Sequence, residues 1–416
     1  MKILWISHLV PYPPKAGVLI RSHYLVKELA KHHDVDVIAF NQRGLIEPYF
    51  ASYEEGTQKS MQVLKEFCGN VEFFDCPVDK SSLHRYWCAL KSLVSRHPYN
   101  MNWLKSDEFR NAANKLHSDN HYDLIHCDTI SLAPYIDDIK DATLSLDHHN
   151  VESHMLIRRA DQENNLIKKF YFWQEGKRLE NIEKHYCPIF NTNVTCSELD
   201  NDRFRTFIDD ARFVCIPNGV DTSVFKPSGK EPLNSRLIFI GTLDWYPNTK
   251  AVLYIAEKIW PLLKAKIPEV TIDVVGARPP EKLIALSKQD PNFRVHGFVD
   301  DLDQCLSDAT VYVCPIDDGG GTKLKILDAL SAGKAIVANP IACEGIMCED
   351  GKNVLYASSP EQYVEHIEKI FSDQGFRKEL EVAARELAVS QYAFESIGKK
   401  LSDEFENARD FKLKKQ

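Results

Sequence analysis

The sequence predicts an α/β protein built from two doubly wound domains, and three observations support this. Short apolar runs that suit buried strands alternate with longer amphipathic runs that suit helices, which is the pattern of parallel sheets covered by helices. The alternation stops at a turn-rich segment, Ile216–Asp221, and then begins again. The length of 416 residues suits two or three domains. Each half is therefore expected to build its own parallel sheet.

Residues 1–215 are expected to form the first domain. Its predicted strands are Ile3–Ser7, Val35–Phe40, Val71–Cys76, Asp123–Cys127, Leu144–His148 and Val194–Ser197. Its predicted helices include Arg21–Lys31 and one long helix from about Met155 to Tyr186.

Residues 216–393 are expected to form the second domain. Its predicted strands are Leu237–Ile240, Ile272–Val275, Arg294–His296, Val311–Cys314 and Ala335–Ala338, and Thr249–Ala265 is a predicted helix. A last helical stretch, about 394–411, follows the second domain and is expected to pack back on the first. Ligands of such sheets bind at the carboxyl ends of the strands, so we expect the site in the cleft between the domains.

The composition excludes several classes of protein. Hydrophobic residues are 44 % and charged residues 27 % of the chain, which is typical of globular proteins and not of collagen-like or disordered chains. The formal net charge of −9 argues against nucleic acid as a partner. The 11 cysteines are odd in number and form no Cys-x-x-Cys pair, which favours reduced thiols in the cytoplasm. No run of 18 apolar residues suggests a membrane span.

Two strand ends in the first domain carry candidate catalytic residues. Gly17 lies between the first strand and the next helix, where bare backbone lets a ligand approach and helix amides favour an anion. The alternative is an ordinary strand-to-helix turn. Asp147, His148 and His149 follow an apolar strand directly, and an imidazole there can orient a sugar or accept a proton. The alternative is a helix cap at Asn150.

Strand geometry separates the two histidines. Alternate residues of a strand face opposite ways, so only one of His148 and His149 is expected to enter the cleft, and we favour His149. Asp128, at the end of a neighbouring predicted strand, is a weaker candidate.

The most informative segment is Pro315–Leu330, which predicts a strand, a triple-glycine loop and a helix. The loop and helix start, residues 319–322, can cradle a diphosphate on bare backbone. Lys323 and Lys325 are expected in the first helical turn, where the helix dipole disfavours cations unless an anion is bound. Asp328 lies on the same helix face and can accept two ribose hydroxyls. The alternative is a surface helix with scattered charges.

Together these segments resemble glycosyltransferase family 4, whose members are retaining enzymes of the GT-B fold with two Rossmann-like domains. The resemblance rests on the Gly17 loop, Ile216–Asp221, Phe225, Pro227, Gly241, Val275–Gly276, Gly297–Asp300 and Pro315–Lys334. The runs His149–Glu152 and Gly319–Leu330 are similar to a bacterial surface-polysaccharide branch.

The resemblance implies transfer of a sugar from a nucleotide-diphosphate donor, such as a UDP- or GDP-sugar, to a hydroxyl of a glycan or lipid-linked acceptor. It implies no tightly bound cofactor or metal. Two Asp-x-Asp patterns, at residues 34–36 and 301–303, are unconvincing as metal sites. A GT-B-fold sugar-nucleotide epimerase and a non-catalytic sugar-nucleotide binding protein remain alternatives.

The resemblance also assigns residues in the second domain. It places the backbone of Gly297, Phe298 and Val299 at the base, Asp328 at the ribose, and Gly241, Gly320, Gly321 and Thr322 at the phosphates. Gly320 stands where the family has a donor-sugar glutamate, so either Asp317 or Asp318 takes its place or the contact is absent. Gly319 is also expected at the donor sugar. Thr242 and Pro247 stand where a basic pair is usual, so Lys323 and Lys325 are inferred to supply the phosphate charge.

Residues 80–106 contain no acidic residue and are rich in basic and aromatic side chains. Such a stretch can lie on an anionic membrane, which would suit a lipid-linked acceptor. The alternative is an ordinary helix whose apolar stripe faces the core.

Overall fold

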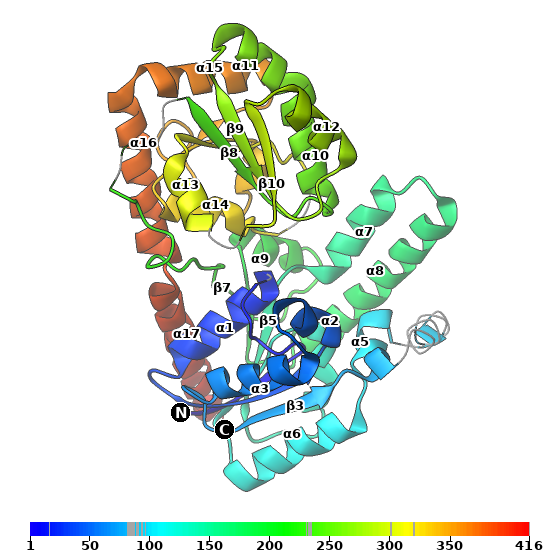
Figure 1. Ribbon diagram of the computed structural model, residues 1–416. Coiled ribbons are helices and arrows are strands. Elements are labelled where there is room, and N and C mark those ends of the chain that lie inside the picture. The colour runs from blue at the N-terminus through cyan, green and yellow to red at the C-terminus, as the bar shows by residue number, and fades with distance from the viewer. Residues whose placement is uncertain are drawn as a thin grey trace. The chain divides into compact units, whose positions relative to one another are not determined.

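The computed structural model (Figure 1) describes residues 1–415 except 16, 81–87, 89–90, 93–94, 96, 230, 232–234, 300–301 and 319–320. The chain divides into two compact units. Unit 1 comprises Met1–Pro217 and Ile397–Gln416, and unit 2 comprises Asn218–Ser396. Each unit contains one parallel sheet, so the predicted α/β fold class is confirmed.

The sheet of unit 1 has seven strands in the order β3-β2-β1-β4-β5-β6-β7. The strands are β1 (Lys2–Ser7), β2 (Asp34–Asn41), β3 (Val71–Asp75), β4 (Leu124–Cys127), β5 (Thr143–His148), β6 (Thr192–Thr195) and β7 (Phe213–Cys215). Successive residues of β1 enter different apolar clusters: Leu4 and Ile6 pack into one, and Ile3 and Trp5 into the other. The sheet is therefore buried on both faces, as its unbroken apolar strands require.

The helices of unit 1 connect these strands. The α-helices are α1 (Gly17–Leu29), α2 (Arg43–Ile46), α3 (Tyr53–Leu64), α5 (Tyr99–Trp103), α6 (Asp107–Asn120), α7 (Glu152–Gln162), α8 (Leu166–Tyr186) and α9 (Glu198–Arg205). Short 3₁₀ segments occupy Glu47–Tyr49, Pro77–Lys80 and Ile130–Ile136.

Two helix predictions in unit 1 need correction. The first helix begins at Gly17 rather than Arg21. The predicted long helix is two helices, α7 and α8. Asn165 ends the continuity, because its side chain accepts hydrogen bonds from the backbone N–H groups of Ile167 and Lys168 and so caps α8.

The sheet of unit 2 has six strands in the order β10-β9-β8-β11-β12-β13. They are β8 (Arg236–Ile240), β9 (Thr271–Val275), β10 (Phe293–Gly297), β11 (Val311–Cys314), β12 (Ala335–Ala338) and β13 (Leu355–Tyr356). The helices are α10 (Tyr246–Tyr254), α11 (Trp260–Lys266), α12 (Glu281–Gln289), α13 (Leu302–Asp308), α14 (Leu324–Ser331), α15 (Pro360–Ser372) and α16 (Gln374–Leu387), with π segments at Ile255–Ile259 and Ala388–Tyr392 and a 3₁₀ segment at Pro340–Cys343.

The last helix, α17 (Phe394–Lys415), carries the chain from unit 2 back to unit 1. Ile397, Leu401 and Phe405 are fully buried in the unit 1 cluster that contains Ile3. Glu404 accepts a hydrogen bond from Thr192 Oγ1 at 2.7 Å. Across the described residues, no helix combines the length and apolarity that crossing a bilayer requires.

Candidate active site

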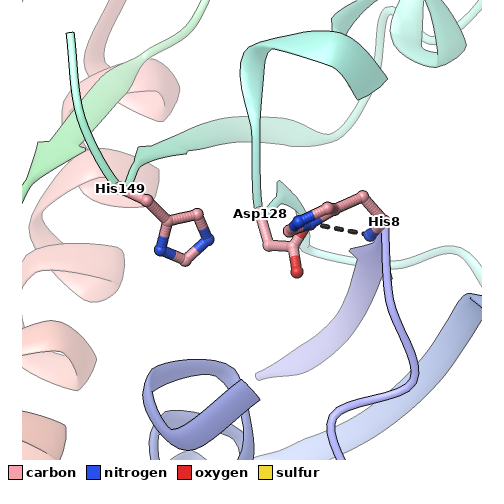
Figure 2. Close-up of side chains that lie close together, drawn as sticks. All are labelled: His8, Asp128 and His149. Atoms are coloured by element: carbon pink, nitrogen blue, oxygen red, sulfur yellow. Dashed lines mark hydrogen bonds and ion pairs between the residues drawn. The ribbon is translucent and has the colours of Figure 1, made fainter. Parts of the chain in front are cut away.

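Three polar side chains meet at the carboxyl ends of neighbouring strands in unit 1. His8 follows β1, Asp128 follows β4, and His149 follows β5. Because β1, β4 and β5 are adjacent and parallel, their ends lie at one edge of the sheet. Figure 2 shows the three side chains gathered there, and one ligating atom from each lies within 4.8 Å of the others.

Asp128 is fully buried and orients His8. Its Oδ1 accepts from the backbone N–H of His8 at 2.9 Å and from the Nδ1 of the same residue at 2.8 Å. Its Oδ2 accepts from Ser7 Oγ at 2.5 Å and Ser22 Oγ at 3.3 Å. Burial raises the pKa of Asp128, but His8 and the other donors leave it below its ordinary value. An ionised Asp128 makes Nδ1–H the donor, so the Nε2 of His8 accepts a hydrogen bond when the ring is neutral and donates one when the ring is protonated.

The two imidazoles differ in their ionisation. Burial lowers the pKa of His8, but Asp128, aided by Glu152 and Asp147, leaves it above the ordinary value of 6.5. Burial lowers the pKa of His149 below that value. The ring centres are 5.8 Å apart. His149 Nε2 is buried and has no hydrogen-bond partner among the described residues, so a ligand hydroxyl could satisfy it.

A carboxylate and two imidazoles are also a metal-ligand set. Here, however, four donors already occupy the two oxygens of Asp128. A metal would have to displace the His8 Nδ1 bond, whereas a hydroxyl can bind the free imidazole nitrogens directly. The cluster therefore fits a sugar hydroxyl better than a cation.

Asp147 and His148 lie in the interior instead. Both Asp147 and Arg21 have 1 % exposed side chains, and Arg21 binds the carboxylate through Nε at 2.7 Å and Nη2 at 3.0 Å. Burial alone would raise the pKa of Asp147, but Arg21, aided by His149, outweighs this and lowers the pKa to about 2. This ion pair ties α1, which Gly17 opens, to the end of β5.

His148 needs a correction. Its Nε2 lies 3.2 Å from Asn193 Oδ1, its ring is 4.6 Å from that of Phe204, and burial lowers its pKa to about 4. It is a core residue, which removes it from the candidate catalytic residues. Asn150 is not the cap of the following helix either, because Val151 occupies that position.

In unit 2, Lys325 on α14 reaches the end of β8. Its Nζ donates to Asn248 Oδ1 at 2.5 Å and lies 5.2 Å from the centre of the Phe239 ring. A Cβ at Gly241 would lie 2.5 Å from this nitrogen and 2.9 Å from the Asn248 side chain, so any larger residue there would push both side chains aside. Burial lowers the pKa of Lys325 to about 8 and raises that of Asp328 to about 7, although Lys325 acts against the second shift.

The segment before α14 is less regular than expected. Lys323 is the N-cap residue and not part of the first turn, and its Nζ donates to the carbonyl of Gly321 at 2.9 Å. Gly321 has a φ of +71°, a conformation that favours glycine. Thr322 Oγ1 is buried without a partner among the described residues. Gly319 and Gly320 lie outside the described residues.

Within the described part of the chain, the residues assigned to the base and the donor sugar do not form one cluster of contacts, unlike Lys325 and Asn248. Gly297 ends β10 with a φ of +67°, Phe298 is 61 % exposed, and Val299 packs on the core. The Asp317 carboxylate pairs with Lys250 Nζ at 2.7 Å, and Asp318 accepts from Tyr246 at 3.3 Å.

A cavity of about 780 Å³ opens beside α10 and is lined in part by Asp317. Its other lining residues include Tyr246, Thr249, Lys250, Asn339 and Tyr363. Lys325 and Asp328 do not line this cavity. The cavity is therefore distinct from the group of residues around the Lys325 ammonium.

Sequence reasoning missed His8, Asn248 and Lys250. His8 directly follows the first strand, just as His149 follows the fifth, so the same strand-end signal was present. Asn248 and Lys250 stand where a helix opens after β8, which is also a typical binding position.

Comparisons with known proteins agree with this architecture. Residues 234–373 match the sequence family described as "Glycosyl transferases group 1". An "uncharacterized 44.6 kDa protein in cps region" of Klebsiella pneumoniae is 21 % identical over 384 residues, covering 88 % of this chain and 90 % of that protein.

Solved structures share the fold at low sequence identity. Sucrose-phosphate synthase from Thermosynechococcus elongatus has a TM-score of 0.68 at 13 % identity, with 98 % of this chain and 99 % of that chain covered. Anabaena HepE in complex with UDP has a TM-score of 0.63 at 15 % identity, with coverages of 98 % and 100 %.

Proposed function

Because the chain is a group 1 glycosyltransferase of family 4 with the GT-B fold, we propose that it transfers a sugar from a UDP-sugar to a hydroxyl of a glycan or lipid-linked acceptor. We propose retention of the anomeric configuration and no metal requirement. The observation that carries the donor assignment is the half-buried Lys325 ammonium beside Asn248, Gly241 and Asp328.

This ammonium has the properties of a diphosphate site. Burial without an anion destabilises its charged form, as the lowered pKa shows. A diphosphate would restore that stability, and the leaving nucleoside diphosphate needs positive charge during transfer. Asp328 lies within electrostatic reach of Lys325, and its carboxylate suits a ribose diol. HepE, which shares the fold, has been solved with UDP and with UDP-glucose, which supports uridine over guanosine.

For unit 1 we propose that His149 and His8 bind sugar hydroxyls. The unpartnered Nε2 of His149 and the Nε2 of His8, whose Nδ1 is held by Asp128, supply two hydrogen-bonding atoms for such hydroxyls. Asp128 acts as a positioning residue, because it fixes the orientation of His8. The match to a protein named for a cps region supports a role in surface polysaccharide synthesis.

The first test is nucleotide recognition followed by turnover. The full chain is screened with UDP, GDP and ADP by thermal shift, because ligand at 100 times its dissociation constant stabilises a protein by about 2.7 kcal/mol. UDP is expected to raise the melting temperature most. The corresponding UDP-sugars are then incubated without acceptor. Conversion of the donor to an isomeric nucleotide sugar would identify an epimerase and contradict the proposal, whereas slow hydrolysis to UDP is compatible with a transferase.

A further inference from the structure

α7 and α8 form a helical hairpin in unit 1 whose tip exposes large apolar side chains. Figure 1 shows the two helices alongside one another, joined by residues 163–165. Leu166 and Ile167 are 80 % and 82 % exposed, and Phe170 and Trp173 are 61 % and 47 % exposed. We call these four residues the α8 apolar face. Large apolar side chains gathered on a few helical turns mark an interaction surface.

The α8 apolar face is not needed to pack the hairpin. Its residues recur at intervals of three and four, which places them on one side of the helix. The packing of α8 against α7 occurs further along, where Gly176 lies so close to α7 that an added Cβ would be 2.8 Å from Ile157 Cγ1 and 3.1 Å from the Ser153 carbonyl. The first two turns of α8 are therefore available for another partner.

The charge around the face is positive, although the whole chain carries −9. Residues 158–173 contain four basic and two acidic residues, and no acidic residue lies between 164 and 173. Lys168 and Lys169 are exposed on the same turns as the apolar side chains. The N-terminus of α8, at the tip, adds the partial positive charge of the helix dipole.

The described part of residues 80–106 lies beside the same helix but is not free. Glu175 of α8 accepts from the backbone N–H of Tyr99 at 2.7 Å, and Met101 and Leu104 are buried in the core. Residues 81–87, 89–90, 93–94 and 96 lie outside the described residues. The described apolar positions of that stretch are thus committed to the core, whereas those of the α8 apolar face are not.

We propose that the tip of the α7–α8 hairpin docks on an anionic lipid bilayer. The geometry suits this partner: Leu166, Ile167 and Phe170 enter the acyl boundary, Trp173 lies at the headgroup level, and Lys168 and Lys169 contact anionic headgroups. A second protein surface would not require lysines interleaved with largely exposed aliphatic side chains, whereas an anionic bilayer selects both. Docking of this kind holds the enzyme beside a lipid-linked acceptor and is independent of the donor chemistry.

The test is co-sedimentation of the full chain with phosphatidylcholine vesicles, with and without phosphatidylglycerol. Wild type is expected to bind the phosphatidylglycerol vesicles, less so at high salt. The double variant Ile167→Glu/Phe170→Glu is expected to lose binding about tenfold or more, because charge replaces the inserted side chains. Lys168→Gln/Lys169→Gln is expected to lose the preference for phosphatidylglycerol while keeping its fold.

A matched control is Ile284→Glu/Val382→Glu in unit 2, whose side chains are 38 % and 57 % exposed; it is expected to bind vesicles like wild type. Melting temperature and UDP affinity are measured for every variant, so that misfolding or failure of the donor proposal is recognised separately. Equal vesicle binding by wild type and Ile167→Glu/Phe170→Glu would overturn the proposal. So would sedimentation velocity showing that the face instead joins two copies of the chain, with no vesicle binding.

Discussion

Lys325 is a half-buried cation in the first turn of α14, where the helix dipole opposes positive charge. Its hydrogen-bond partner, the Asn248 side chain, is neutral. We expect Lys325→Ala to weaken the binding of UDP by roughly 1.5–3 kcal/mol, or about 10- to 150-fold in Kd, because a charge-assisted hydrogen bond to the diphosphate is lost. We expect a loss in the same range for Lys323→Ala. Isothermal titration calorimetry measures both, with Lys352→Ala, an exposed site paired with Glu349, as the control. Two variants with wild-type affinity would contradict the assignment.

The same lysine predicts a pH dependence of binding. With a pKa of about 8 in the free protein, lowered by burial, Lys325 is protonated at pH 7 and largely neutral at pH 9. The protonated form binds the diphosphate, so UDP affinity is expected to fall as the pH rises through 8. Arginine stays charged across this range, so Lys325→Arg is expected to show a flat profile. Parallel profiles for wild type and Lys325→Arg would rule out this lysine as the titrating group.

Asp328 predicts opposite effects on binding and stability. Burial raises its folded pKa to about 7 from 3.8. Between these values the unfolded chain releases a proton that the folded protein keeps, so wild-type stability falls as the pH rises through this window and levels off above pH 7. Asp328→Asn does not titrate, so its stability relative to wild type is expected to increase from pH 4 to pH 7. UDP affinity is expected to drop by about 1–3 kcal/mol. Chemical denaturation and calorimetry at pH 5 and pH 8 separate the two effects; parallel losses would make Asp328 merely structural.

His149 and His148 are neighbours with different expected phenotypes. We expect His149→Ala to lower kcat about 10²-fold, the scale of losing a positioned polar group, while UDP affinity stays within a few-fold because Lys325 and Asp328 are intact. His148→Ala is expected to lower the free energy of unfolding, since it removes a side chain packed against Phe204. Steady-state kinetics and urea denaturation of both variants provide the comparison. If His148→Ala were the variant with lower kcat and normal stability, the two roles would be reversed.

The sequence indicates some of these residues and not others for a physical reason. Lys325 and Asp328 are three apart in one helix, so helical geometry alone brings them together. The approach of Asn248 to Lys325 spans 77 positions and depends on how α10 and α14 pack. Similarly, His149 is visible as a polar residue after an apolar strand, but its proximity to His8 requires the strand order β1-β4-β5, which periodicity does not reveal.

At the scale of elements, the buried strands are predicted best. Val311–Cys314 and Ala335–Ala338 are confirmed at both ends, because fully buried strands are unbroken apolar runs. The strands β7 and β13 have only three and two residues. They form by pairing with β6 and β12 at the edges of the two sheets, so no long apolar run marks them in the sequence. The break between α7 and α8 was missed because a single capping asparagine, Asn165, determines it.

The α7–α8 hairpin gives a prediction of its own. Gly176→Val places a side chain within 2.8 Å of Ile157 Cγ1, so α7 must move away or the core must strain. We expect a loss of about 1–3 kcal/mol in the free energy of unfolding, with faster amide hydrogen exchange in α7 and unchanged UDP affinity. Gly44→Ala, where an added Cβ meets nothing within 4 Å, is the control. Wild-type exchange in α7 of the Gly176→Val variant would show that the hairpin is not packed this closely.

At the scale of the whole molecule, the restart of the strand pattern indicates two sheets, but it does not mark where the units end. The expected boundaries lay at 215/216 and 393/394, whereas the structure divides at Pro217/Asn218 and Ser396/Ile397. The second division falls inside α17. Phe394 packs against Gly219 in unit 2, and Ile397, one turn later, is buried in unit 1. Continuous helical periodicity cannot show such a change of surroundings.

This connectivity has a consequence for biosynthesis. Unit 2 is inserted into unit 1, whose cluster around Ile3 is completed by Ile397, Leu401 and Phe405. Domains generally fold as they leave the ribosome, the N-terminal one first. Here the unit that is begun first must be the last to finish, because its closing helix is translated after all of unit 2. Throughout that interval the nascent chain presents an open apolar surface along α1 and β1, which is where a ribosome-associated chaperone would have to act.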